Sequence, residues 1–192
     1  MSGLIQQGSL LLRHMEETSE DVRTFLRWMT DPATNRYWDG MTERYDYDRV
    51  VRRHREHLQA GVTPCMIVQD GESIGYLQFY PIACAEDNDL PPEMYGAFVR
   101  PGETVYGIDL FIGRTDLRGR GTGTAVVRMA CDLLFGVCGA SHILVDPKIH
   151  NARAIRCYEK AGFRHWFTVS GREQQDGIFY DSFIMGRDRE QK

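Results

Sequence analysis

The residues best suited to bind a ligand form one short glycine-rich segment, Arg118-Gly119-Arg120-Gly121-Thr122-Gly123-Thr124. Its three glycines lack the Cβ atoms that would keep a ligand away from the backbone. An apolar-periodic segment follows, so the unpaired N–H groups at the start of a helix point toward this loop. The pattern predicts a phosphate-binding turn, and a tight turn without a ligand is the alternative.

The spacing of this segment argues against the two common nucleotide-binding loops. It lacks the Lys-Ser/Thr ending of a P-loop, and the Rossmann pattern requires a different glycine interval and a following acidic residue. A pyrophosphate that binds without a nucleotide-hydrolysing lysine suggests coenzyme A.

A second motif lies downstream of this loop. Asp146-Pro147 precedes a segment in which Asn151 begins a helix, Tyr158 lies within it and Gly162-Phe163 ends it. Together with the R-x-x-G-x-G spacing of the loop, this segment resembles the GNAT superfamily of N-acetyltransferases. The resemblance implies that acetyl-CoA is the acetyl donor.

Within that superfamily the sequence is most similar to the aminoglycoside 6'-N-acetyltransferases. The likeness covers about residues 63–163 and includes Gly75-Tyr76-x-Gln78-x-Tyr80, Gly107-Ile108-Asp109 and Asp146-Pro147. It implies acetyl transfer to the 6'-amine of aminoglycoside antibiotics, which confers resistance. The chain departs from these relatives at Ile149-His150 and at Arg118, where a Gln is common.

The resemblance also implies which residues contact the cofactor. The strand before the loop is expected to splay from its neighbour, so that backbone N–H groups can polarise the thioester carbonyl. The residues expected to bind acetyl-CoA are Leu110, Ile112, Arg118, Gly119, Arg120, Gly121, Thr122, Gly123, Thr124, Asn151, Ala154 and Tyr158.

Amide formation from a thioester requires a neutral amine and a proton for the departing thiolate. We expect Asp109 to act as base or ammonium anchor, Asp146 as a second anchor and Tyr158 as the proton donor to sulfur. The alternatives are turn-capping or strand-ending roles for the two aspartates and a core position for the tyrosine.

Acceptor binding is expected at Trp38, Gln78, Tyr80, Glu93, Asp109 and Asp146. Glu93 belongs to an acidic loop, residues 84–104, that would attract a polycation and could cover the acceptor. Trp38 and Tyr80 would supply flat walls against sugar rings, although aromatic residues near a hairpin are often packing residues.

Three alternative functions remain possible from the sequence. The acceptor could be a protein amine, either an N-terminus or a lysine, or a small metabolite amine such as a polyamine. The chain could be a non-catalytic acyl-CoA-binding module, but such a module would need only the loop. A purely structural protein would leave the two motifs as coincidence.

Composition narrows the class of partner. The 192 residues carry a net charge of -4, which makes nucleic acid or anionic lipid an unexpected partner. The five cysteines show no C-x-x-C spacing and no ligand cluster indicates a metal. Without a recognisable targeting or membrane segment we expect one cytoplasmic GNAT domain spanning residues 1–192, as a monomer or a homodimer.

Periodicity supplies the elements that must position these residues. Helical spacing is expected from 19 to 29, from 47 to 58, after residue 122 and over 151–161, and strands at 9–13, 65–68, 73–80, 105–112, 141–145, 166–170 and 178–185. The polar face of the second helix, with Arg49, Arg52, Arg53 and Arg55, is interpreted as solvated. The expected fold is α/β (α+β), a mixed GNAT sheet of about seven strands flanked by about four helices.

Overall fold

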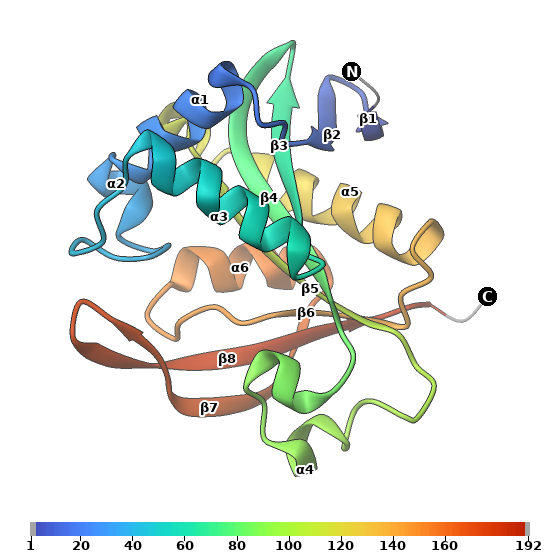
Figure 1. Ribbon diagram of the computed structural model, residues 1–192. Coiled ribbons are helices and arrows are strands. Elements are labelled where there is room, and N and C mark those ends of the chain that lie inside the picture. The colour runs from blue at the N-terminus through green and yellow to red at the C-terminus, as the bar shows by residue number, and fades with distance from the viewer. Residues whose placement is uncertain (1–2, 191–192) are drawn as a thin grey trace.

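A computed structural model describes residues 3–190. Its centre is an eight-stranded sheet in the order β1-β2-β3-β4-β5-β6-β8-β7 (Figure 1). All neighbouring strands are antiparallel except β5 and β6, which are parallel. The strands are β1 (Gly3–Gln7), β2 (Leu10–His14), β3 (Thr63–Gln69), β4 (Glu72–Ile82), β5 (Val105–Ile112), β6 (His142–Val145), β7 (Arg164–Gln175) and β8 (Ile178–Asp188).

Helices cover both faces of this sheet. The α-helices are α1 (Ser19–Met29), α2 (Pro32–Asn35), α3 (Tyr47–Gln59), α4 (Pro92–Tyr95), α5 (Thr122–Gly136) and α6 (Ala152–Lys160). Side chains of α5 and α6 share one apolar core with the sheet, whereas those of α1 and α3 form another. Figure 1 shows the short α4 beside β7 and β8, away from the other helices.

The two faces follow from strand alternation in β3. Cys65 and Ile67 belong to the core under α5, whereas Met66 and Val68 belong to the core under α1 and α3. Successive side chains of a strand point to opposite faces, so a strand covered on both sides is apolar throughout. This explains why the segment lacks the polar alternation of a half-exposed strand.

Local capping sets where the helices begin. The Thr18 side chain accepts a hydrogen bond from the N–H of Asp21, and the Asn151 side chain accepts one from the N–H of Ala154 at 3.2 Å. Each satisfies a donor that has no partner inside the helix. Both starts agree with the sequence prediction.

The β5–β6 pair is short. Its register runs from Val105 opposite His142 to Gly107 opposite Leu144, while β5 itself continues to Ile112. On its other side β5 pairs with β4 along its whole length. The two parallel strands therefore part in the middle of the sheet, which is the splay expected from the resemblance.

The fold class is confirmed, with differences in detail. The sheet has eight strands because β1, where no strand was predicted, pairs with β2. A short helix, α2, was not predicted, and the Asp31 side chain caps it by accepting a hydrogen bond from the N–H of Ala33. The 84–104 stretch contains α4 and a 3₁₀ turn, η1 (Ala85–Asn88). Across residues 3–190, no helix has the length and apolar character needed to cross a bilayer.

The tight approach of β4 to β5 generates a stability prediction. A Cβ on Gly75 would lie 2.4 Å from the carbonyl oxygen of Phe111, a backbone atom that cannot rotate away. We expect Gly75→Ala to lower the free energy of unfolding by about 2 kcal/mol through overpacking. Urea unfolding measures the change. Gly136→Ala, where an added Cβ meets nothing within 4 Å, should leave stability unchanged or slightly higher.

Candidate active site

A cavity of about 970 Å³ lies where β5 and β6 part. Its walls come from β4, β5, the glycine loop, the loop after β6, α6 and the segment after α2. Most residues predicted to be functional line it: Trp38, Gln78, Tyr80, Asp109, Leu110, Ile112, Arg118, Gly119, Gly121, Gly123, Thr124, Asp146, Asn151, Ala154 and Tyr158.

The glycine loop forms one end of this cavity. Gly119 and Gly121 have φ values of +75° and +89°, and an added Cβ at either would meet nothing within 4 Å. Gly121 is the N-cap of α5 and has no side chain to satisfy the first N–H groups of the helix. The loop thus presents open space and unpaired donors, which suits a pyrophosphate.

The helices behind the loop approach each other closely. A Cβ on Gly123 would lie 3.3 Å from the Sγ of Cys157, and Thr124 Oγ1 donates a hydrogen bond to the Cys157 carbonyl at 3.5 Å. Basic side chains lie along the same wall, namely those of Arg128, Arg153, Arg156 and Lys160. This end therefore carries the positive charge that a polyphosphate requires.

Arg118 has a structural role beside any role in binding. Its guanidinium donates to the carbonyl of Ile112 at 2.7 Å, to the carbonyl of Ala33 at 2.8 Å and to Thr34 Oγ1 at 2.6 Å. It thereby ties α2 to the end of β5. Three of its five side-chain N–H groups are used within the protein, and its backbone N–H donates to the carbonyl of Thr115 at 3.2 Å.

Asp109 lies at the other end of the cavity, three residues before the end of β5. Gln78, opposite it on β4, donates a hydrogen bond to Asp109 Oδ2 at 2.9 Å and accepts one from the hydroxyl of Tyr76 at 3.0 Å. The ring of Tyr80 packs on Gly107, where a Cβ would approach the ring to 2.4 Å. A polar pocket with an aromatic wall surrounds the carboxyl group.

The environment of Asp109 favours its neutral form. Burial, and then the negative charge of Asp146, raises the pKa of Asp109 to about 7, although the hydrogen bond from Gln78 opposes the rise. A carboxyl group with a pKa near neutrality can exchange protons at the pH of the cell. The site therefore contains a candidate base at the floor of the cavity.

Asp146 is held by a residue that sequence analysis missed. Arg172 of β7 donates to Asp146 Oδ2 from two nitrogens, at 3.2 and 3.0 Å, and to the carbonyl of Asp89 at 3.0 Å. Three segments distant in sequence meet at this guanidinium. Arg172 lies between the predicted strands 166–170 and 178–185, and the sequence there did not indicate this contact. The contact depends on the register of β7 with β8.

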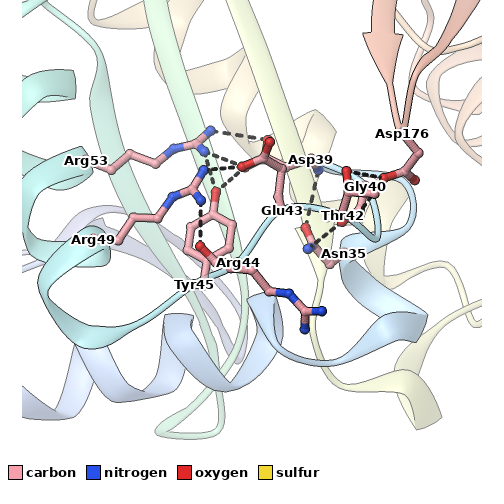
Figure 2. A network of polar contacts seen from close by, with 10 residues as sticks. All are labelled: Asn35, Asp39, Gly40, Thr42, Glu43, Arg44, Tyr45, Arg49, Arg53 and Asp176. Atoms are coloured by element: carbon pink, nitrogen blue, oxygen red, sulfur yellow. Dashed lines mark hydrogen bonds and ion pairs between the residues drawn. The ribbon is translucent and has the colours of Figure 1, made fainter.

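Two further ion pairs in the cavity wall were also missed. Lys148 Nζ lies 2.6 Å from Glu173 Oε2. Arg53, assigned to a solvated helix face, instead pairs with Asp39 and lines the cavity. Figure 2 shows Arg53 and Asp39 converging on the hydroxyl of Tyr45. The assignment of Arg53 was wrong because the chain after α2 folds back over α3.

Tyr158 occupies α6 with its side chain buried, 5.8 Å from the ring of Phe163 between centroids, and it lines the cavity. Burial, with a smaller contribution from the Asp109 charge, raises the pKa of Tyr158 well above its ordinary value. The phenol therefore holds its proton at neutral pH. It combines a core position with access to the site.

Three predicted residues are absent from the cavity lining within residues 3–190. Arg120 and Thr122 belong to the glycine loop and the start of α5, beside residues that do line the cavity. Glu93 is exposed on α4, which packs against η1. Its charge can act on the cavity only through space.

The segment after α2 and the β7–β8 hairpin, which both contribute residues to the cavity lining, contact each other. Asp176, at the turn between β7 and β8, accepts hydrogen bonds from the N–H groups of Met41 at 2.9 Å and Thr42 at 2.7 Å. Gln175 donates to the carbonyl of Arg36 at 3.0 Å. Figures 1 and 2 show the hairpin tip lying against the loop after α2.

Comparison with known proteins shows which family the sequence matches. Residues 17–170 match the model described as the acetyltransferase (GNAT) domain. The chain is 34% identical to the aminoglycoside N(6')-acetyltransferase type 1 of Klebsiella pneumoniae over 164 residues, which cover 84% of this chain and 77% of that protein.

Solved structures agree. The aminoglycoside acetyltransferase AAC(6')-Ib in complex with coenzyme A and kanamycin superposes with a TM-score of 0.73 at 31% identity, over 94% of this chain and 95% of that one. A spermidine N-acetyltransferase from Vibrio cholerae has the same TM-score, 0.73, at 15% identity, over 95% of this chain and 96% of that one. At that identity it shows the fold alone.

The raised pKa of Asp109 predicts that replacing this residue by Asn increases the stability of the protein by an amount that depends on pH. The folded protein holds the proton up to about pH 7, whereas the unfolded chain releases it near the ordinary value of 3.8. Ionisation of Asp109 therefore costs stability progressively as pH rises through that interval. In urea unfolding, Asp109→Asn should be more stable than the parent at pH 8, and the gain should shrink toward pH 4.

Asp87 supplies a control of opposite sign. It is exposed, and the N–H of Ala83 lowers its pKa, so its ionised form is favoured in the folded protein. Asp87→Asn should lose stability at pH 8 relative to pH 4. A gain for Asp109→Asn that is equal at both pH values would contradict the assignment of a raised pKa.

Proposed function

The chain belongs to the GNAT acetyltransferase family, and we propose that it transfers the acetyl group of acetyl-CoA to the 6'-amine of aminoglycoside antibiotics. The observation that carries the proposal is Asp109. Its carboxyl group lies in the cavity that begins at a phosphate-binding turn, and its pKa is about 7. The relative's name, borne by a protein 34% identical over 84% of this chain, supplies the acceptor.

The phosphate-binding end of the cavity fits coenzyme A. Gly119, Gly121 and the first turn of α5 would hold the pyrophosphate, and the basic side chains of α6 would add charge. Leu110 and Ile112 lie on the part of β5 that continues past its pairing with β6, so their backbone can meet the pantetheine arm. When bound, acetyl-CoA supplies the acetyl group as a thioester.

Asp109 prepares the acceptor. An amine arrives as an ammonium ion, which a carboxylate binds by charge and hydrogen bonding. Asp109 then takes the proton, directly or through a water molecule, and the freed nitrogen lone pair forms the C–N bond as the C–S bond breaks. Its pKa near 7 makes this transfer accessible at neutral pH.

Tyr158 completes the reaction at sulfur. Its phenol keeps its proton because burial raises its pKa, so it can donate a hydrogen bond to the sulfur before the bond breaks. As the thiolate forms, it takes the proton of the phenol, and the second proton of the attacking nitrogen passes through water to the phenolate, which restores Tyr158.

The walls around Asp109 suit an amino sugar. Tyr80 and Trp38 present aromatic faces to the cavity, and within residues 3–190 the indole N–H of Trp38 is buried without a partner. Gln78 holds the Asp109 carboxyl group in place. Sugar rings pack well on aromatic side chains.

The first test is release of thiol from acetyl-CoA by the purified protein with kanamycin. Spermidine and a lysine peptide serve as alternative acceptors, and paromomycin, which has a 6'-hydroxyl group, serves as the control for position. Turnover with kanamycin and none with paromomycin is expected. Turnover with spermidine or the peptide alone would assign a different acceptor to the same fold.

The pH profile tests Asp109 as base. Because the ionised form is the active one, kcat/KM for kanamycin should rise with pH through about 7, the pKa of Asp109. Asp109→Asn should lower kcat by roughly 100-fold or more, the usual contribution of general base catalysis. Its affinity for acetyl-CoA, measured by calorimetry, should stay within about twofold. An unchanged kcat would remove Asp109 from the mechanism.

The loop assignment has a separate test. Gly121→Asp places a carboxylate where the pyrophosphate is proposed to lie, so acetyl-CoA affinity should fall at least tenfold, or about 1.4 kcal/mol. Gly61→Asp is the matched control, since Gly61 also has a positive φ, +78°, and open space around it. Equal acetyl-CoA affinities in the two variants would show that the loop does not bind the cofactor.

A further inference from the structure

Each carboxylate in the described cavity lining has a cationic partner, with one exception. Four carboxylates line the cavity: Asp39, Asp109, Asp146 and Glu173. Three have cationic partners, which are Arg53 for Asp39, Arg172 for Asp146 and Lys148 for Glu173. Within residues 3–190, no ion pair joins a cation to Asp109.

Backbone hydrogen bonds on both sides fix the position of Lys148. The N–H of Ile149 donates to the carbonyl of Asp181 at 3.0 Å, and the N–H of Phe183 donates to the carbonyl of Pro147 at 3.0 Å. These bonds join the loop after β6 to β8 on both sides of Lys148. Its side chain is only 5% exposed, so its ammonium cannot swing into solvent.

Glu173 is fully engaged by its neighbours but remains within reach of the cavity. Oε2 contacts the Lys148 ammonium, and Oε1 accepts a hydrogen bond from Ser182 Oγ at 3.3 Å. Its side chain is 34% exposed, and its charge contributes to the raised pKa of Asp109. Lys148, Glu173 and Asp109 line the same cavity, so the ion pair can act on an acceptor that binds there.

We propose that Lys148, fixed against Glu173, is a specificity-determining residue that disfavours aminoglycosides with a second amine on the ring that bears the 6'-amine. This inference rests on the proposed function. The first ammonium of such a ring binds Asp109, which has no competing cation. A second ammonium on the same ring meets the Lys148 ammonium, or must displace it from Glu173, and both cost free energy. A hydroxyl group at that position meets neither obstacle.

Kanamycin A and kanamycin B provide a matched pair of acceptors. They differ only at the 2' position of the ring that bears the 6'-amine, where A has a hydroxyl group and B has an amine. We expect the parent protein to prefer A in kcat/KM by about tenfold, the size of effect that one poorly placed like charge produces. The preference should appear in KM, because the acetylated amine is the same.

Lys148→Met should remove the preference or reverse it, because Glu173 becomes free to bind the 2'-ammonium. Lys148→Arg keeps the charge and should keep the preference. Arg164→Met is the matched control: it also removes one paired cation, at the exposed Arg164–Asp188 contact, outside the cavity lining. It should leave the ratio for the two drugs unchanged.

Glu173→Gln should strengthen the preference for kanamycin A, and it tests the inference if Lys148→Met fails to fold. It leaves the Lys148 ammonium without its carboxylate, so KM for kanamycin B should rise more than KM for kanamycin A. A ratio of the two drugs that stays within twofold of the parent ratio in the folded variants would overturn this inference alone. If the parent protein acetylates neither drug, the proposed function fails, and the inference fails with it.

Discussion

β5 and β6 are hydrogen-bonded over three residue pairs and then separate, and the rest of the site depends on this separation. A strand edge in the middle of a sheet presents backbone donors and acceptors that require partners. Here β4 holds the other side of β5 along its whole length, and β8 holds β6, so the gap cannot close by a shift of either strand. A ligand with amide groups of its own is the natural partner for such an edge.

The separation of β5 and β6 also gives one cavity a positively charged end and an end that contains a carboxyl group. The glycine loop and the basic side chains of α6 lie at one end, and Asp109 lies at the other. An acyl donor with a polyphosphate and an acceptor with ammonium groups are each drawn to their own end. At the proposed acceptor end, the internal cations offset the charges of three carboxylates, which leaves Asp109 as the carboxylate without a cationic partner within residues 3–190. Asp109 is in turn held in a place that disfavours its charge, a cost to stability that is typical of catalytic groups.

Features that depend on local interactions could be predicted from the sequence, whereas features that depend on distant contacts could not. The strand from Val105 to Ile112 and the cap at Asn151 matched the structure, because apolar runs and capping residues act within a few positions. The pairing of Arg172 with Asp146 could not be read in the same way. It requires the register of β7 on β8, with a bulge between Val169 and Glu173 that changes which side chains face the cavity.

The same limit explains the misassigned arginine and the unexpected position of Glu93. Arg53 lies on the polar side of an amphipathic helix, and only the return of the chain after α2 turns that side into a wall of the cavity. Glu93 follows an acidic stretch, yet α4 keeps it on the outer surface. The return of the chain is fixed by Asp176, which binds the backbone N–H groups of Met41 and Thr42 (Figure 2). The proposed donor end thus comes mainly from one continuous stretch of sequence, residues 105–160, with Ala33 and Thr34 of α2 holding Arg118, whereas the proposed acceptor end needs segments from both ends of the chain. Under the proposed function, substitutions in the segment after α2 or in the β7–β8 hairpin can therefore change the acceptor without disturbing the loop that we propose binds the acyl donor.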